Sequence, residues 1–285
     1  MDILCVVVVY KPDISLLIKN IHGFIADVKK VIVWQNSKLT NENIACLNSS
    51  FNAERIVIAG NGTNEGIPKA LNYAIDHMEE YECDNLLTMD QDSRWVNFHT
   101  YVSFIENEPK DRIYGPEVIG NTDTNIGEQH NKYLMIRDAG YVITSGMLCH
   151  RNVLSEVGRF NEALFIDAVD EEYCYRARNK GIKSVQVQGA FLKQQFGESR
   201  IESFAGRKTI VSNYSAFRYY YIVRNHLYLI RTSLPTKEEK KSIFINYVRA
   251  PLIKCFLFEK HKAKKLSAIV RGVFSGLTMK MVKEK

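Results

Sequence analysis

Two aspartates one residue apart, Asp90 and Asp92, follow a short apolar run at Leu86–Met89. The run predicts a buried strand that ends directly in the acidic pair. Because side chains alternate across an extended backbone, both carboxylates project to one side while Gln91 projects to the other. Two like charges this close repel each other unless a cation or a hydrogen-bond donor lies between them. The pattern indicates either a site for Mg²⁺ or Mn²⁺, which prefer carboxylate oxygens, or a solvated acidic turn.

A second acidic cluster comprises Asp167, Asp170, Glu171 and Glu172. It opens a predicted helix, in which Asp170 suits the N-cap and the two glutamates suit the positive end of the helix dipole. Glu172 and Arg176 are four residues apart and can pair on one helix face. Helix capping explains part of this cluster, but one cap does not require four carboxylates in six residues. The alternative is that Asp167 and Asp170 flank the mouth of a pocket.

The residues before Asp90 alternate between predicted strands and helices. The predicted strands are Ile3–Tyr10, Val31–Trp34, Arg55–Ile58 and Leu86–Met89, and the helices between them are Ile14–Phe24 and Ile67–Glu80. This order predicts an open α/β sheet, in which ligands bind in the crevice outside the carboxyl ends of the strands. The residues that stand at those ends are Tyr10, Asn36, Asn64 and Asp90. They are therefore candidates for one binding site.

Beyond Trp95 the pattern is less regular. Short strands are expected at Ile113–Pro116 and Tyr141–Thr144, a polar loop at Gly120–Lys132, and a helix at Asn152–Val157. The earlier glycine-rich segment Gly60–Gly66 has neither a P-loop nor a Gly-x-Gly-x-x-Gly pattern. It is either a glycine-rich turn or a loop that brings backbone close to a nucleotide.

Composition points to a globular protein with one large domain or a domain with an appendage. The chain has 285 residues, of which 46% are hydrophobic and 25% charged, which is ordinary for a soluble protein. Its six cysteines are scattered, so neither a zinc site nor a disulfide framework is indicated, and a reducing, cytosolic compartment is expected. No basic region precedes an apolar stretch at the N-terminus, and no apolar run approaches the ~20 residues that span a bilayer.

Positive charge gathers at the C-terminal end of the chain. From Thr236 to Lys285 there are 13 Lys or Arg and 4 Glu, a net charge of +9 in a chain of net charge +6. Within it, Ile243–Phe258 has apolar residues close to one helical stripe, flanked by lysines. This stretch indicates either an amphipathic basic surface for an anionic leaflet or a solvated helical pair packed on the main domain. No nucleic-acid-binding module is recognised. The preceding aromatic helix, Asn213–Ile230, is either a helical core element or an acceptor-binding helix.

Taken in order, these segments resemble glycosyltransferase family 2, the inverting enzymes with the GT-A fold, and most closely its rhamnosyltransferase-like bacterial members. The resemblance covers Ile3 to about Tyr228. The matching segments are Val7–Asp13, Gln35–Ser37, Asn64–Ile67, Ala70–Asn72, Met89–Ser93, Thr144–Gly146, Gly158–Glu162, Phe165–Asp167, Asp170–Glu172 and Tyr220–Asn225. The resemblance implies a GT-A domain at residues 1–210 and a basic, aromatic-rich helical extension at residues 211–285.

The resemblance also assigns roles to individual residues. Asp90 and Asp92 would hold Mg²⁺ or Mn²⁺ on the diphosphate of a nucleotide sugar, with Asp92 as the main ligand. Asp170, six residues before Arg176, falls at the position of the catalytic base. The residues implied in donor binding are Tyr10, Asp13, Gln35, Asn36 and Asn64, together with the aspartate pair. The residues implied at the acceptor are Asp167, Glu172 and Arg224, where Asp167 and Glu172 either shape the acceptor site or hold the base in place.

Two residues depart from the family pattern. Gln194 stands where these enzymes commonly carry a metal-ligating His, so dependence on the metal is in question. Gln35 stands where related sequences often place an acid that reads the base.

The expected function is transfer of a sugar from a nucleotide diphosphate to a lipid-linked oligosaccharide in cell-surface polysaccharide synthesis. The first expectation for the donor is dTDP-rhamnose, which supplies L-rhamnose. The expected location is the inner face of the cytoplasmic membrane. The alternatives are transfer of galactofuranose from UDP-galactofuranose and a nucleotide-sugar-binding module without catalysis. A nucleotidyltransferase is disfavoured, because the N-terminal glycine-rich loop of those enzymes is missing.

Overall fold

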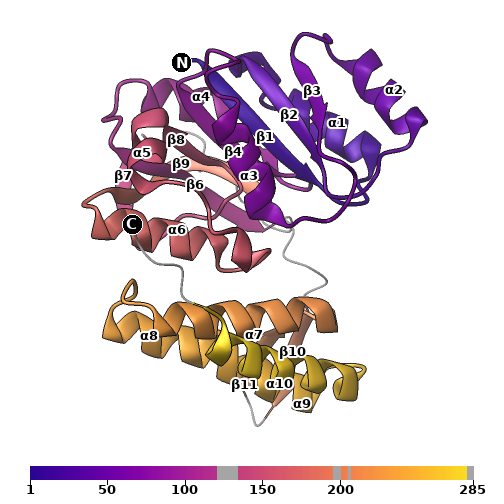
Figure 1. The fold of residues 1–285 in the computed structure, drawn as a ribbon, viewed down its shortest axis with the longest axis vertical. Coiled ribbons are helices and arrows are strands. Elements are labelled where there is room, and N and C mark those ends of the chain that lie inside the picture. The colour runs from indigo at the N-terminus through magenta and orange to yellow at the C-terminus, as the bar shows by residue number, and fades with distance from the viewer. Residues whose placement is uncertain (121–133, 195–199, 205–206, 281–285) are drawn as a thin grey trace. The chain divides into compact units, whose positions relative to one another are not determined.

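The computed structural model describes residues 1–120, 134–194, 200–204 and 207–280 (Figure 1). The chain forms two compact units. The first, called here the sheet unit, is Met1–Ala163 with Val169–Gln195, and the second, the helical unit, is Leu164–Ala168 with Phe196–Lys285. The polar loop expected at Gly120–Lys132 lies outside the described residues from residue 121 onward.

The first half of the sheet is built on β1 (Ile3–Val9), whose seven residues are all buried. A run of β-branched side chains suits a strand that is covered on both faces. Strand β1 pairs in parallel with β2 (Lys30–Gln35) and β4 (Asn85–Asp90), and β2 pairs with β3 (Ile56–Ala59). In this register Val8 lies opposite Asp90 and Val9 opposite Gln35. The carboxyl ends of β1, β2 and β4 therefore lie side by side.

The second half of the sheet mixes directions. Beyond β4 the order is β8 (Met147–His150), β6 (Arg112–Gly120), β9 (Lys183–Gln194) and β5 (Arg94–Trp95), and β7 (Met135–Ala139) also pairs with β9. Strand β8 is antiparallel to β4 and β6, while β6 and β9 are parallel. The result is an open mixed sheet.

One strand expectation is wrong. Tyr141–Thr144 forms no strand, and the chain enters the sheet only at Met147. Gly146, with φ of +84°, turns the chain just before β8. Val142 instead packs on β6, where a Cβ built on Gly115 would lie 2.5 Å from the Val142 Cβ. The Val142 side chain therefore packs against a glycine of β6, and its segment does not pair as a strand.

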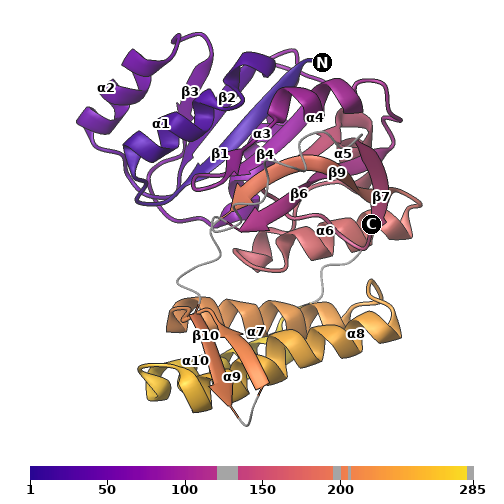
Figure 2. The same ribbon diagram turned by 180° about the vertical axis from the view of Figure 1, so that it is seen from behind.

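Helices cover both faces of the sheet (Figures 1 and 2). They are α1 (Ile14–His22), α2 (Asn41–Ser50), α3 (Ile67–Asp76), α4 (Phe98–Ile105), α5 (Arg151–Val157) and α6 (Val169–Asn179), with short 3₁₀ turns at Ile25–Asp27 and Glu162–Leu164. On α1, Leu17 and Ile21 are buried four residues apart, and on α3 Leu71 and Ala74 are buried three apart. This is the spacing of one helix face on a core.

The helical unit combines a two-stranded hairpin with a group of helices. Its elements are β10 (Arg200–Phe204), β11 (Arg207–Val211), α7 (Ala216–Arg231), α8 (Lys237–Ile243), the π-helical segment η4 (Phe244–Arg249), α9 (Ala250–Phe258) and α10 (Lys262–Thr278). Helix α10 runs against α7 through Gly272 and Gly276. A Cβ on these glycines would lie 2.7 Å from the Tyr220 carbonyl oxygen and 2.6 Å from that of Arg224. In the part of the chain that the structure describes, no helix has the length and apolar character needed to cross a bilayer.

Candidate active site

Asp90, at the end of β4, contacts Ser145 and Gln194. The Asp90 backbone N–H donates to Ser145 Oγ at 3.2 Å, and Asp90 Oδ2 accepts from Gln194 Nε2 at 3.0 Å. Ser145 is fully buried, Asp90 is half-buried, and Asp92 lies exposed in the turn beyond the strand. Two strands, β4 and β9, and the turn before β8 therefore meet at Asp90.

Gln91 ties the ends of β1 and β4 together, a role that the sequence did not reveal. Its Oε1 accepts from the Tyr10 N–H at 2.7 Å, and its Nε2 donates to the Tyr10 carbonyl at 3.2 Å. Asn20 Nδ2 donates to the Gln91 carbonyl at 3.0 Å. The indication in the sequence was the alternation of side chains along an extended strand, which directs the Gln91 side chain to the side opposite the two carboxylates.

At the end of β2, Asn36 is only 4% exposed and supports the glycine-rich loop. Its Oδ1 accepts from Trp34 Nε1 at 3.1 Å and from the Glu65 N–H at 3.3 Å. Its Nδ2 donates to the Gly66 carbonyl at 3.2 Å. Beside it, Gln35 Oε1 accepts from a backbone N–H at 3.0 Å. The amide of Asn36 thus fixes the loop that leads into α3.

The other predicted donor-binding residues lie at the starts of helices or in the open. Asp13 caps α1, since its Oδ1 accepts from the Leu16 N–H at 3.0 Å. Asn64 Oδ1 accepts from the Gly66 N–H at 3.3 Å, just before α3. Tyr10 is 47% exposed, with Lys11 Nζ 5.4 Å from the centre of its ring. An exposed aromatic ring at this edge is available for stacking.

Helix α6 lies on the side toward which β1 and β4 run (Figures 1 and 2). The segment 142–145 contacts both regions. Ser145 accepts from the Asp90 N–H, and the Val142 carbonyl accepts from Cys174 Sγ at 3.8 Å. Asp170 is one turn before Cys174 on α6, hence on the same helix face. The end of β4 and helix α6 thus both contact the segment 142–145.

The start of α6 differs from the expected cap. The helix begins at Val169, so Asp170 lies within the first turn and not at the N-cap. The preceding residue, Ala168, has a left-handed conformation with φ of +61°, and the helical backbone begins at the next residue. Asp170 Oδ1 accepts from the Glu171 N–H at 3.0 Å. Its carboxylate is thereby fixed near the positive end of the helix dipole.

The predicted pair between Glu172 and Arg176 is confirmed. Arg176 Nε and Nη2 donate to the two Glu172 oxygens at 3.0 and 2.9 Å. Arg176 also donates to the backbone carbonyls of Val157 at 2.6 Å and Arg159 at 3.0 Å. Such two-point contacts are the geometry in which Arg binds carboxylates most strongly. The pair anchors α6 to the end of α5.

In the helical unit, Asn225 holds the short segment 164–168 on α7. It is fully buried, and its Nδ2 lies within hydrogen-bond distance of three carbonyls, those of Leu164 at 2.7 Å, Ile166 at 2.6 Å and Asp167 at 2.9 Å. Phe165, Asp167 and Ala168 have φ of +66°, +63° and +61°. Left-handed residues in such a run cost free energy that surrounding contacts must offset.

The two predicted acceptor residues of this unit lie at the same segment. Arg224 Nη2 donates to the Leu164 carbonyl at 2.9 Å, and its guanidinium lies 4.5 Å from the centre of the Tyr221 ring. Asp167 Oδ1 accepts from Arg218 Nη2 at 3.2 Å, while the buried Oδ2 has no hydrogen-bond partner among the residues that the structure describes. Asp167 belongs to the segment 164–168, and Arg224 on α7 binds the same segment through the Leu164 carbonyl.

The residues at Asp90 fit a divalent cation. Mg²⁺ is commonly held by one or two carboxylates and completed by substrate phosphates and water. Asp90 and Asp92 supply the carboxylates, and the buried Gln194 Oε1, which has no hydrogen-bond partner among the described residues, is available as a further oxygen ligand. Within residues 1–120, 134–194 and the later described ranges, no three His, Cys, Asp or Glu side chains gather as a ready-made metal site. A cation here would depend on the phosphate oxygens of the substrate.

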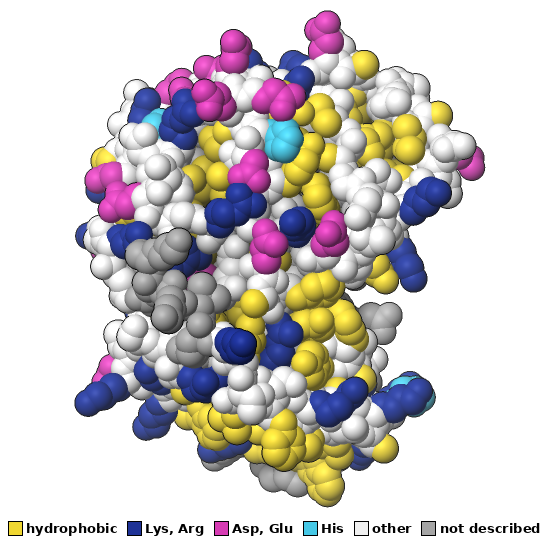
Figure 3. Space-filling view, in the orientation of Figure 1, with side chains coloured by type: hydrophobic (Ala, Val, Ile, Leu, Met, Phe, Trp, Pro, Cys, Tyr) yellow, Lys and Arg dark blue, Asp and Glu magenta, His cyan; other side chains and the backbone are white. Residues whose placement is uncertain are grey.

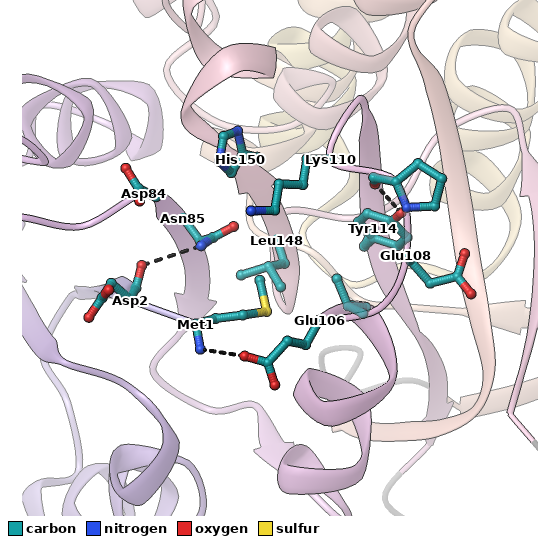
Figure 4. Close-up of a pocket in the computed structure, with 12 residues that line it drawn as sticks. Met1, Asp2, Asp84, Asn85, Glu106, Glu108, Lys110, Tyr114, Leu148 and His150 are labelled. Atoms are coloured by element: carbon teal, nitrogen blue, oxygen red, sulfur yellow. Dashed lines mark hydrogen bonds and ion pairs between the residues drawn. The ribbon is translucent and has the colours of Figure 1, made fainter.

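A distinct pocket lies at the opposite edge of the sheet, where β1 and β4 begin (Figure 4). Its lining includes Asp84, Asn85, Glu106 and His150. Asp84 pairs with Arg151 at 3.1 Å. Burial, followed by the nearby Lys110 charge, lowers the pKa of the His150 imidazole. Ligands of open α/β sheets bind at carboxyl ends, so we do not assign the donor to this pocket.

Comparison with known proteins gives named relatives. No model of a protein family matches the chain. The chain is 27% identical over 300 residues to the dTDP-rhamnosyl transferase RfbF of Shigella flexneri. The alignment covers 96% of this chain and 97% of that protein. It is 24% identical over 224 residues to the low-salt glycan biosynthesis hexosyltransferase Agl10 of Haloferax volcanii, covering 71% and 70%.

Solved structures match the fold. The mannosyltransferase PcManGT from Pyrobaculum calidifontis, in complex with GDP-Man and Mn²⁺, superposes with a TM-score of 0.60 at 12% identity, covering 98% of this chain and 76% of that one. S. aureus TarS 1–349 in complex with UDP-GlcNAc superposes with a TM-score of 0.57 at 13% identity, covering 96% and 82%. The expected GT-A architecture with C-terminal helices is confirmed. Together, this fold and the two named relatives support a glycosyltransferase that uses a nucleotide sugar.

Proposed function

We propose that the chain is an inverting glycosyltransferase of family 2 that transfers L-rhamnose from dTDP-rhamnose to a lipid-linked oligosaccharide in surface polysaccharide synthesis. The observation that carries the proposal is the 27% identity to a dTDP-rhamnosyl transferase over nearly the full length of both chains. The carboxylates at the end of β4 supply the chemistry that this reaction needs.

The donor is proposed to lie across the carboxyl ends of β1, β2 and β4. The exposed ring of Tyr10 stacks on the base, and Asp13, Gln35 and Asn64 lie around the nucleoside. Asn36 keeps the Gly66 turn in place through its buried amide. Asp90 and Asp92 would hold a divalent cation, which when bound would neutralise the charge that develops on the leaving diphosphate. Gln194 orients Asp90 by donating to its Oδ2 at 3.0 Å.

Asp170 is proposed as the general base. Inversion requires attack from the face of the sugar opposite the leaving diphosphate, so the base and the metal-holding carboxylates have to be separate groups. Asp170 accepts the proton of the acceptor hydroxyl as the new glycosidic bond forms. Glu172, paired with Arg176, fixes the first turns of α6 and so the position of Asp170. Asp167 and Arg224 remain proposed acceptor-binding residues.

The test is an assay of sugar transfer with purified protein and a lipid-linked oligosaccharide acceptor. The account predicts transfer from dTDP-rhamnose, an inverted anomeric configuration in the product, and stimulation by Mg²⁺ or Mn²⁺. UDP-galactofuranose is the second donor in the screen, and transfer from it alone would replace rhamnose in the proposal.

A third result would change the class of function. Binding of a nucleotide sugar without transfer to any lipid-linked acceptor would identify a binding module, the alternative suggested by Gln194 at the usual His position. Retention of configuration would contradict the single-displacement mechanism, even if rhamnose were transferred.

A further inference from the structure

The outer face of α10 is apolar where a solvated helix would be polar. Gly272 and Gly276 face α7. With 3.6 residues per turn, Phe274 lies about 200° around the helix from Gly272, pointing away from α7. Val270, Phe274 and Leu277 recur at four and three residues and are 48%, 68% and 52% exposed. Surface helices normally place polar side chains on this side.

Helix α9 extends this apolar face. Leu252, Ile253 and Phe256 are 44%, 44% and 65% exposed and fall within one turn. Helix α9 packs against α10, and Figure 3 shows hydrophobic side chains gathered over these two helices. The patch defined by these residues is called here the α9–α10 patch: Leu252, Ile253, Phe256, Val270, Phe274 and Leu277. Grouped apolar side chains of this kind mark an interaction surface.

The charged residues around the patch are basic. Lys260, Lys264 and Arg271 are exposed at its borders. Between Ala250 and Thr278 the sequence has one acidic residue, Glu259. That residue is 2% exposed and forms an ion pair with Lys265. The outward side of α9 and α10 therefore presents apolar groups and positive charge, without exposed carboxylates from these helices.

The corner between the two helices is fixed from within. Tyr219 on α7 donates its hydroxyl to Glu259, and Lys265 bonds both Glu259 and Asn213 Oδ1, the latter at 2.9 Å. Burial and the bond to Glu259 raise the pKa of the Tyr219 hydroxyl well above its usual value. This buried network sets the angle at which α9 and α10 meet, so the patch is preformed.

We propose that the α9–α10 patch docks the protein on the surface of an anionic lipid bilayer. Apolar side chains enter the boundary between headgroups and acyl chains, while the basic border attracts acidic headgroups. A second copy of the chain fits less well, because a two-fold contact would press two identical basic borders together. The inference extends the proposed lipid-linked acceptor to a docking surface, but its evidence comes from the helical unit alone.

Flotation with vesicles tests the docking directly. Full-length protein is mixed with vesicles of neutral phosphatidylcholine or with vesicles containing about one third phosphatidylglycerol, in low and high salt. Binding is expected on the anionic vesicles and should weaken with salt, since screening reduces the electrostatic part. The double variant Phe256→Ser/Phe274→Ser should lower the partition coefficient about tenfold or more.

Matched variants separate docking from general surface effects. Leu16→Ser/Met135→Ser changes two exposed apolar residues of the sheet unit, which are 43% and 56% exposed, and should leave flotation unchanged. Replacing Lys260, Lys264 and Arg271 by Gln should reduce binding to anionic vesicles on the order of a hundredfold at low salt. The same exchange at Lys19, Lys110 and Lys180, all exposed in the sheet unit, should have little effect.

Equal binding by the wild type and the double phenylalanine variant would overturn the proposal, as would a failure of the wild type to float. Sedimentation velocity adds one more contrary outcome: a dimer that the phenylalanine exchanges dissociate would make the patch a self-interface. Flotation requires no sugar donor. A protein that floats but transfers no sugar contradicts only the proposed function, and one that transfers sugar without floating contradicts only the docking.

Discussion

Strand β4 carries carboxylates at both ends, and the two ends are built differently. At its amino end Asp84 pairs with Arg151 beside a pocket. At its carboxyl end Asp90 accepts from Gln194 Nε2 and its backbone N–H donates to Ser145 Oγ, with Asp92 exposed beyond it. A cavity alone therefore does not locate the chemistry. Ligands of open α/β sheets bind at the carboxyl edge, so Asp90 and Asp92 are the candidates for holding a cation, whereas Asp84 pairs with Arg151 at the other edge.

Exchange of the aspartates at the two ends should give the largest contrast. Asp92→Asn and Asp90→Asn should each lower kcat for sugar transfer about 10²–10³-fold, the usual cost of losing a group that stabilises transition-state charge. Asp84→Asn should change kcat by less than about twofold, because an exposed ion pair contributes about 0–1 kcal/mol to stability only. Steady-state kinetics with saturating Mn²⁺ provide the comparison. An equal loss at both ends would remove the distinction.

Substitution of Gly146 tests how tightly the backbone before β8 is packed at the carboxyl end of β4. It has φ of +84°, and an added Cβ would lie 2.7 Å from Pro116 Cγ. Gly146→Ala should cost about 2–4 kcal/mol of unfolding free energy from backbone strain and overpacking combined. The control is Gly181→Ala, at φ of +82° with open space around the Cβ, which should cost about 1–2 kcal/mol from strain alone. Urea unfolding measures both, and equal costs would show that the packing around Gly146 is unimportant.

Exchanges of Gln194 test whether this side chain contributes to cation binding at the carboxyl end of β4. Gln194→Ala removes the donor to Asp90 and should raise the dissociation constant for Mn²⁺ in the presence of nucleoside diphosphate about tenfold, the lower end for residues that orient a ligand. Gln194→His supplies an imidazole, a better ligand for Mn²⁺ than a neutral amide, and should lower that constant. Gln186→Ala, on the same strand β9, is the control. Calorimetry that found no change in either variant would separate Gln194 from the cation.

The amino end should respond to pH through stability. The pKa of His150 is lowered from 6.5 in the folded chain, mainly by burial. The unfolded chain then binds more protons, so the unfolding free energy should fall as the pH drops below about 6.5. His150→Gln removes this dependence. The check is the difference in unfolding free energy between wild type and variant from pH 8 to pH 5, and a constant difference would contradict the assignment.

Much of the fold is readable from the chain because its strands are strong patterns. The buried runs at β1 and β4 and the helix between β3 and β4 were predicted within a few residues of their observed bounds. The region before β8 was not. Met147–His150 lacks the β-branched residues that mark strands, while Tyr141–Thr144 has them but packs on Gly115 instead of pairing.

For the candidate site, the sequence offers those residues whose chemistry is local in the chain. Asp90, Asp92 and Asp170 stand out as carboxylates at the ends of elements. The supporting contacts join residues far apart in the chain, such as Gln91 with Tyr10 and Asn225 with the carbonyls of segment 164–168. No spacing rule relates such partners, so only the folded structure could identify them.

The central claim is that Asp170 deprotonates the acceptor while a separate pair of carboxylates serves the donor. The most direct measurement compares transfer and donor affinity in Asp170→Asn, with the exposed exchange Asp138→Asn as control. The account predicts that kcat for transfer falls about 10²–10⁴-fold, while the dissociation constant for dTDP-rhamnose stays within about threefold, since a base acts in the transition state more than in donor binding. Transfer at the wild-type rate in Asp170→Asn would contradict it.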